Sequence, residues 1–289
     1  MSTTNKAIVF LALAYAISWS IGIGAHYAGL ASSIPATAIL AATMTGPAIA
    51  ALICAFAFDK GRRVEALGLH FKPNWWWLAA YFIPIALAVI AVGATILLGE
   101  RHYIDIGQAT AAVAASQGQD LSQAPAFLLS TTFIVGMALT LGALINAPIL
   151  TFTEELGWRG YLHGLWRPSG FWRASLGTGA VWGLWHAPAI WFYGLNYPAD
   201  RALGIALFVV FCVMLSPLMT LVRDRGGSVW AAGIFHGVFN AVGGFTIAAV
   251  SDPTFPWNGI VGIGGYVALA LGLGAVVLLQ RRPAPAPAA

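Results

Sequence analysis

The chain has 289 residues, of which 14 are Lys or Arg and 10 are Asp or Glu, so that only 8% of the sequence is charged. An average soluble domain has about 25% charged residues, and a net charge of +4 is too small for a nucleic-acid-binding face. The composition therefore excludes a soluble globular protein, a disordered chain and a nucleic-acid binder, and favours a polytopic helical membrane protein in contact with the lipid bilayer.

Long apolar runs divide the chain into about eight predicted membrane-spanning helices. Each run holds about 20 mainly apolar residues, enough to cross a hydrocarbon core of about 30 Å. The predicted spans are residues 7–29, 35–58, 75–98, 126–151, 175–193, 203–222, 229–250 and 259–280. We therefore expect one all-α transmembrane domain over residues 1–282, and a disordered Pro/Ala tail at residues 283–289.

The basic residues are distributed unevenly between the two sides of these spans. Twelve of the 14 Lys and Arg residues fall on the side of the N-terminus, and only Arg101 and Arg201 fall on the other. The positive-inside rule then predicts that both termini are cytoplasmic, in a protein of the plasma (inner) membrane. The first span is longer than the apolar core of a signal peptide and lacks a clear cleavage site, which favours an uncleaved helix.

Ionisable side chains inside the spans are the first functional candidates, because charge at membrane depth is costly. Glu154 and Glu155 lie at the expected inner end of the fourth span, His186 lies in the fifth, and His236 lies in the seventh. Asn240 follows His236 by four residues, so both side chains share one helix face. These residues define a motif-bearing core at about residues 126–250.

The two glutamates are expected to play different roles. Glu155 and Arg159 are four residues apart and can form an ion pair on one helix face, whereas Glu154 points about 100° away. Glu154 is then free for chemistry or for a partner on another helix. The structural alternative is a solvated helix end that carries a single salt bridge.

Each histidine also has a structural and a functional interpretation. His186 lies among Trp182, Trp185 and Pro188, where it could simply bind a neighbouring carbonyl. His236 and Asn240 could form an interhelical hydrogen-bond pair. A pair of glycines four residues apart lies near each histidine and allows close helix packing. Gly179 and Gly183 precede His186, and Gly233 and Gly237 flank His236.

Taken together, the polar residues form a set suited to hydrolysis. A carboxylate can accept a proton from water, an imidazole can orient that water, and His and Asn donors can stabilise an oxyanion. Alternatively, Glu154, His186 and His236 are ligands of a catalytic zinc that keeps one position for water. We prefer the metal-free interpretation, because Asn240 is a poor zinc ligand and a good oxyanion donor.

At these residues the sequence resembles the CAAX prenyl endopeptidase and Abi-type (CPBP) intramembrane proteases. The family hallmarks correspond to Glu154-Glu155-x-x-x-Arg159, Trp182-x-x-x-His186 and His236-x-x-x-Asn240, in this order. The family more often has Phe at the position of Trp182, which we interpret as a packing variant. The resemblance covers residues 154–240, roughly the second half of the chain.

The resemblance implies an intramembrane endopeptidase that hydrolyses a membrane-anchored protein or peptide near the cytoplasmic face. It implies that Glu154 activates water with His186, that His236 and Asn240 stabilise the oxyanion, and that Glu155 and Arg159 are supporting residues. No cofactor is preferred, and the zinc-dependent, metalloprotease-like version stays open. The competing hypotheses are a proton-coupled transporter and a non-catalytic membrane immunity protein.

Overall fold

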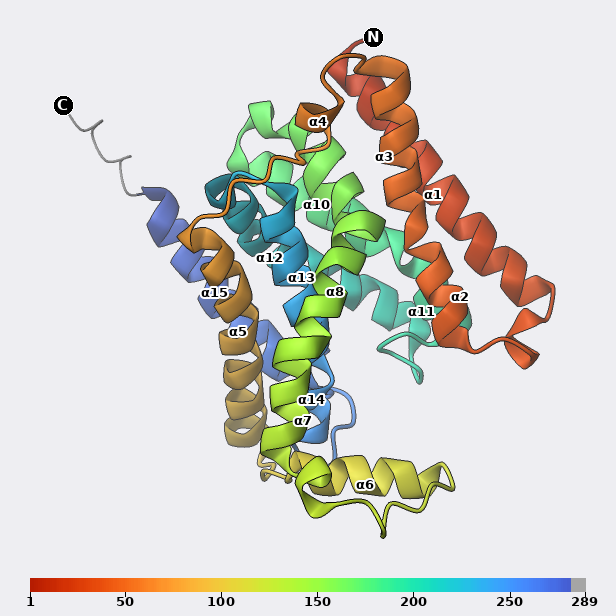
Figure 1. The fold of residues 1–289 in the computed structure, drawn as a ribbon, viewed down its shortest axis with the longest axis vertical. Helices are drawn as coiled ribbons and strands as arrows, with labels where there is room; N and C mark the ends of the chain where they lie inside the picture. Colours follow the sequence, from red (N-terminus) through yellow and green to blue (C-terminus); the bar gives the residue numbers. More distant parts are fainter. Residues whose placement is uncertain (282–289) are drawn as a thin grey trace.

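The computed structural model describes residues 1–281, and within them seven helices are long and apolar enough to cross a membrane (Figure 1). No β-strand forms in this part of the chain. The predicted all-α polytopic fold is therefore confirmed. The seven helices are α1 (Thr3–Tyr27), α2 with α3 (Ala36–Phe58), α5 (Trp75–Gly99), α7 to η5 (Thr131–Ser169), α12 (Arg201–Gly226), α13 with α14 (Val229–Ala248) and α15 (Ile263–Arg281). The predicted tail, residues 283–289, lies outside the described residues.

The fifth predicted span, residues 175–193, is not one continuous helix. Helix α10 (Phe171–Trp185) ends at His186, and the short helix α11 (Ala187–Tyr193) follows it. Pro188 lies in the first turn of α11, where its missing N–H is tolerated, but the same residue would interrupt a continuous helix. An end or kink of this helix near Pro188 is also what the sequence predicts, and the break falls directly at His186, a candidate site residue.

The fourth span extends further than predicted. Its helix runs from Thr131 to Ser169 and not over residues 126–151, so Glu154 and Glu155 lie inside the helix rather than at its end. They belong to a π-helical segment, η4 (Thr151–Leu162), which follows α8 (Ala143–Leu150). The helix continues past the apolar run because its polar residues are buried against one another, as described below. Extra-residue turns of this kind are frequent at functional sites.

The other helices lie on both sides of this long helix and next to it. Helices α1 to α3 lie on one side, where α3 packs against η4, and α5 with α15 lie on the other (Figure 1). Helices α10, α12 and α13 lie between them, and α6 (Ile106–Ser116) crosses one end of the bundle. The start of α1 and the end of α15 both lie in the upper half of Figure 1.

Glycine allows two of the central helix pairs to pack closely. On α10, a Cβ atom added at Gly179 would lie 2.6 Å from the carbonyl oxygen of Cys212 on α12. On α13, a Cβ atom added at Gly237 would lie 2.5 Å from the backbone nitrogen of Ala147 on α8. The expected close approach of helices at these glycines is therefore present, and it fixes the helices that carry His186 and His236.

Gly237→Ala is expected to destabilise the protein by about 1–3 kcal/mol, because α13 must move away from the backbone of α8. Thermal unfolding of the purified protein in detergent measures the effect. Gly274→Ala in α15 is the matched control, since a Cβ atom at Gly274 meets nothing within 4 Å. Equal unfolding temperatures for the two variants would show that the contact between α13 and α8 does not require glycine.

Candidate active site

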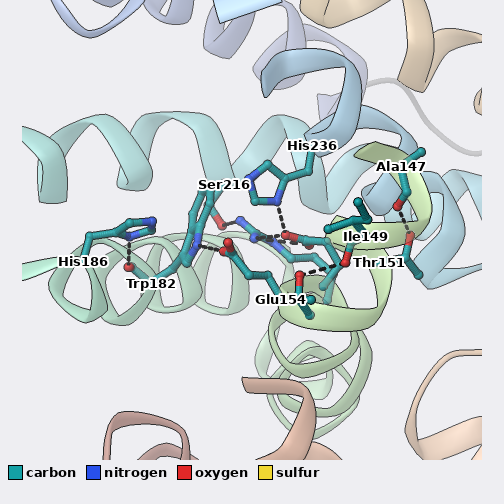
Figure 2. A network of polar contacts seen from close by, with 11 residues as sticks. Ala147, Ile149, Thr151, Glu154, Trp182, His186, Ser216 and His236 are labelled. Atoms are coloured by element: carbon teal, nitrogen blue, oxygen red, sulfur yellow. Dashed lines mark hydrogen bonds and ion pairs between the residues drawn. The ribbon is translucent and has the colours of Figure 1, made fainter. Parts of the chain in front are cut away.

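Glu154 lies on η4 with its carboxylate turned toward α10. Its side chain is almost fully buried, and Oε2 accepts a hydrogen bond of 2.9 Å from the indole Nε1 of Trp182 (Figure 2). The sequence analysis left Glu154 free for a partner on another helix, and the structure supplies that partner. Trp182 is therefore more than the packing variant that we expected, because a phenylalanine has no N–H to donate.

Glu155 and Arg159 form the predicted ion pair, one turn apart and buried. Arg159 Nη1 lies 3.0 Å from Glu155 Oε1, and the two side chains are 1% and 0% exposed. The guanidinium also lies 4.3 Å from the centroid of the Trp182 ring, and its Nη2 donates to the hydroxyl of Ser216 at 3.3 Å. The opposite charges compensate each other, which allows both groups to remain inside the bundle.

His236 on α13 is held by the same carboxylate. Its Nδ1 lies 2.8 Å from Glu155 Oε1, and the imidazole is buried (Figure 2). A carboxylate accepts hydrogen bonds, so Nδ1 carries the proton and Nε2 is left for other contacts. The sequence did not reveal this contact, because residues 155 and 236 belong to helices that no spacing rule relates.

His186 is positioned by the break between α10 and α11. Its backbone N–H donates to Gly183 instead of continuing the α-helical pattern, which leaves the carbonyl of Trp182 free. His186 Nδ1 lies 2.8 Å from that carbonyl oxygen and donates to it, so that Nε2 is the unprotonated nitrogen of the neutral ring. Phe208 packs edge-on against the imidazole, with 4.8 Å between the ring centroids.

A cavity of about 390 Å³ brings the four predicted catalytic residues together. Its walls include Glu154, His186, His236 and Asn240, which come from three different helices. Asn240 is exposed at this cavity, whereas Glu154 and His236 are buried in its wall. Apolar side chains line much of the remainder: Phe208, Phe211, Leu215 and Phe239.

The supporting residues lie behind this wall. Glu155 and Arg159 do not line the cavity and are fully buried. On the opposite side of the cavity, α1 is tied to the broken span by side chains that bind backbone carbonyls: Trp19 donates to Trp185 at 3.0 Å, and Tyr193 donates to Gly22 at 2.6 Å. The cavity is thus enclosed between the α1–α3 group and the helices that carry the polar residues.

The zinc alternative finds no matching donor set in this geometry. Among residues 1–281 no three His, Cys, Asp or Glu side chains are arranged to hold a metal ion, and this includes Glu154, His186 and His236. Each imidazole uses Nδ1 for a hydrogen bond within the protein, which leaves Nε2 as its one free nitrogen, an arrangement that is also usual for zinc-binding histidines.

Comparison with known protein families finds a family model that matches residues 135–242. The fold defines a polytopic helical membrane protein with a cavity inside its bundle that is lined by the four polar candidate residues. The model of the family described as "Type II CAAX prenyl endopeptidase Rce1-like" matches residues 135–242, which contain all six predicted site residues. Residues 135–242, less than half of the chain, are therefore similar to the domain found in CAAX-type intramembrane proteases of this family. None of the curated proteins compared with the chain matches it.

Proposed function

We propose that this protein hydrolyses a peptide bond of a membrane-anchored protein or peptide, and that Glu154 activates the attacking water. The observation that carries the proposal is the shared cavity of Glu154, His186, His236 and Asn240. The cavity lies inside a bundle of membrane-spanning length, and most of its wall is apolar. A substrate segment that is itself anchored in the bilayer would reach such a site without crossing water.

In the proposed reaction, Glu154 is the general base. Its Oε2 is engaged by Trp182, which leaves Oε1 to take a proton from water. The unprotonated Nε2 of His186 accepts a hydrogen bond from the same water and orients it toward the scissile carbonyl carbon. The water oxygen bonds to that carbon, the carbon–nitrogen bond breaks, and the proton held by Glu154 passes to the leaving amine.

The oxyanion formed in this step is assigned to His236 and Asn240. The amide group of Asn240 can donate in any protonation state. His236 can donate from Nε2 only as an imidazolium, and its ring is held by the contact of 2.8 Å between Nδ1 and Glu155 Oε1. Donors that are fixed before the reaction contribute most to such stabilisation, because they need no reorganisation.

The proposal also covers the depth and the side of cleavage. We place the cut near the cytoplasmic face, because Glu154 follows the apolar part of its helix on the side where most basic residues lie. Cytoplasmic termini in the plasma membrane remain part of the proposal, supported by the start of α1 and the end of α15, which both lie in the upper half of Figure 1.

The test uses the purified full chain in liposomes, with one peptide sequence in three forms. One form has a prenylated C-terminus, one has a single apolar anchor, and one has no anchor. We expect cleavage of an anchored form, no cleavage of the unanchored form, and unchanged rates after treatment with a chelator. Loss of activity on chelation that zinc restores would favour the zinc mechanism. If the wild type cleaves none of the three forms, the proposal is wrong.

A further inference from the structure

We propose that Trp182 is a positioning residue, whose indole N–H holds the Glu154 carboxylate in its reactive orientation. The inference rests on the proposed role of Glu154 as the base. Its physical basis is the hydrogen bond of 2.9 Å between Trp182 Nε1 and Glu154 Oε2. Within residues 1–281 this is the one hydrogen bond that the Glu154 side chain makes. A carboxylate on a flexible side chain therefore depends on this single donor for its orientation.

The same residue also positions the partner of Glu154. The backbone carbonyl of Trp182 accepts the hydrogen bond from His186 Nδ1 at 2.8 Å, which selects the tautomer with a free Nε2. Trp182 thus orients the proposed base through its side chain and the proposed water-orienting imidazole through its main chain (Figure 2). The relative placement of the two groups follows from the geometry of one residue.

Trp182 can have this role because its own position is fixed. The face of its ring lies 4.3 Å from the Arg159 guanidinium carbon, and the His236 ring packs edge-on with 5.3 Å between centroids. Gly179 and Gly183 lie on either side of it in the sequence and bring α10 against the backbone of α12. Only 3% of the Trp182 surface is exposed. The indole therefore has no room to turn its N–H away from Glu154.

The hydrogen bond depends on the indole and not on aromatic character alone. A phenylalanine would keep an aromatic ring between Arg159 and His236, but it has no donor for Glu154. Hydrogen bonds to charged groups are stronger than neutral ones, and mispositioning of a catalytic group lowers the rate of the chemical step. The cost of losing this N–H should therefore appear in kcat rather than in substrate binding.

Trp182→Phe is expected to lower kcat about 10- to 100-fold and to leave KM within about threefold of the wild type. The matched control is Trp158→Phe on η4. Trp158 is fully buried and its Nε1 has no hydrogen-bond partner within residues 1–281, so this substitution removes an indole N–H that makes no hydrogen bond. We expect the control to keep kcat within about threefold of the wild type.

A second variant separates the N–H from the volume of the ring. Replacement of Trp182 by benzothienylalanine, in which sulfur takes the place of the N–H, keeps the ring shape and should lower kcat as Trp182→Phe does. If this variant retains wild-type kcat while Glu154→Gln is inactive, the inference is overturned and the proposed function stands. If Glu154→Gln itself cleaves normally, the proposed function fails, together with the inference that depends on it.

Discussion

Glu154→Gln is expected to abolish peptide cleavage, with a loss of at least about 1,000-fold in kcat, while the protein remains folded. The amide oxygen can still accept the hydrogen bond from Trp182, so the side chain keeps its place. An amide cannot take a proton from water, however, and a positioned general base contributes about 100- to 10,000-fold. The measurement is single-turnover cleavage of the anchored peptide in liposomes.

Two further variants complete this experiment. His186→Ala should also be inactive, because the water loses its second contact. Glu65→Gln is the control for the chemical change from Glu to Gln, since Glu65 lies on the short helix α4 (Arg63–Ala66) with its side chain 59% exposed. The control should cleave at the wild-type rate. Full activity of both Glu154→Gln and His186→Ala would contradict the assignment of the site.

Arg159→Met is expected to destabilise the protein by about 3–5 kcal/mol. The substitution leaves Glu155 as a buried carboxylate without its cation, and removal of one partner of a buried ion pair is costly. It also removes the guanidinium that packs on Trp182 and contacts Ser216. Unfolding in a denaturing detergent, followed by loss of helical signal, measures the change in the free energy of unfolding.

An exposed ion pair provides the control for this prediction. Arg62 and Glu65 lie 3.6 Å apart with side chains 81% and 59% exposed, so Arg62→Met should change stability by less than about 0.5 kcal/mol. Replacing both Glu155 and Arg159 by Met should recover much of the lost stability, because no buried charge is left unpaired. The double variant should still be impaired in cleavage, since His236 loses the carboxylate that orients it. Equal stability of Arg159→Met and Arg62→Met would contradict the prediction.

The sequence was sufficient to predict those features that depend on spacing within a single helix. Apolar run length identified an all-α membrane protein, because the width of the bilayer sets a minimum helix length. The spacing of Glu155 and Arg159 predicted their ion pair, since residues four apart always share a helix face. The three motifs also selected four of the polar residues that line the cavity: Glu154, His186, His236 and Asn240. The sequence signal was weaker at the helix boundaries, where the run of polar residues after residue 151 resembled a helix end.

Only the tertiary structure decided which side chains of different helices meet. The hydrogen bonds of His236 to Glu155 and of Trp182 to Glu154 join residues 81 and 28 positions apart. Such contacts depend on how close α10, α12 and α13 lie to η4, which in turn depends on packing at glycines. The break at His186 likewise matters for the site because it leaves the carbonyl of Trp182 free to accept the hydrogen bond from His186 Nδ1. Local periodicity determines the face on which a side chain lies, whereas the packing of the bundle determines its partner.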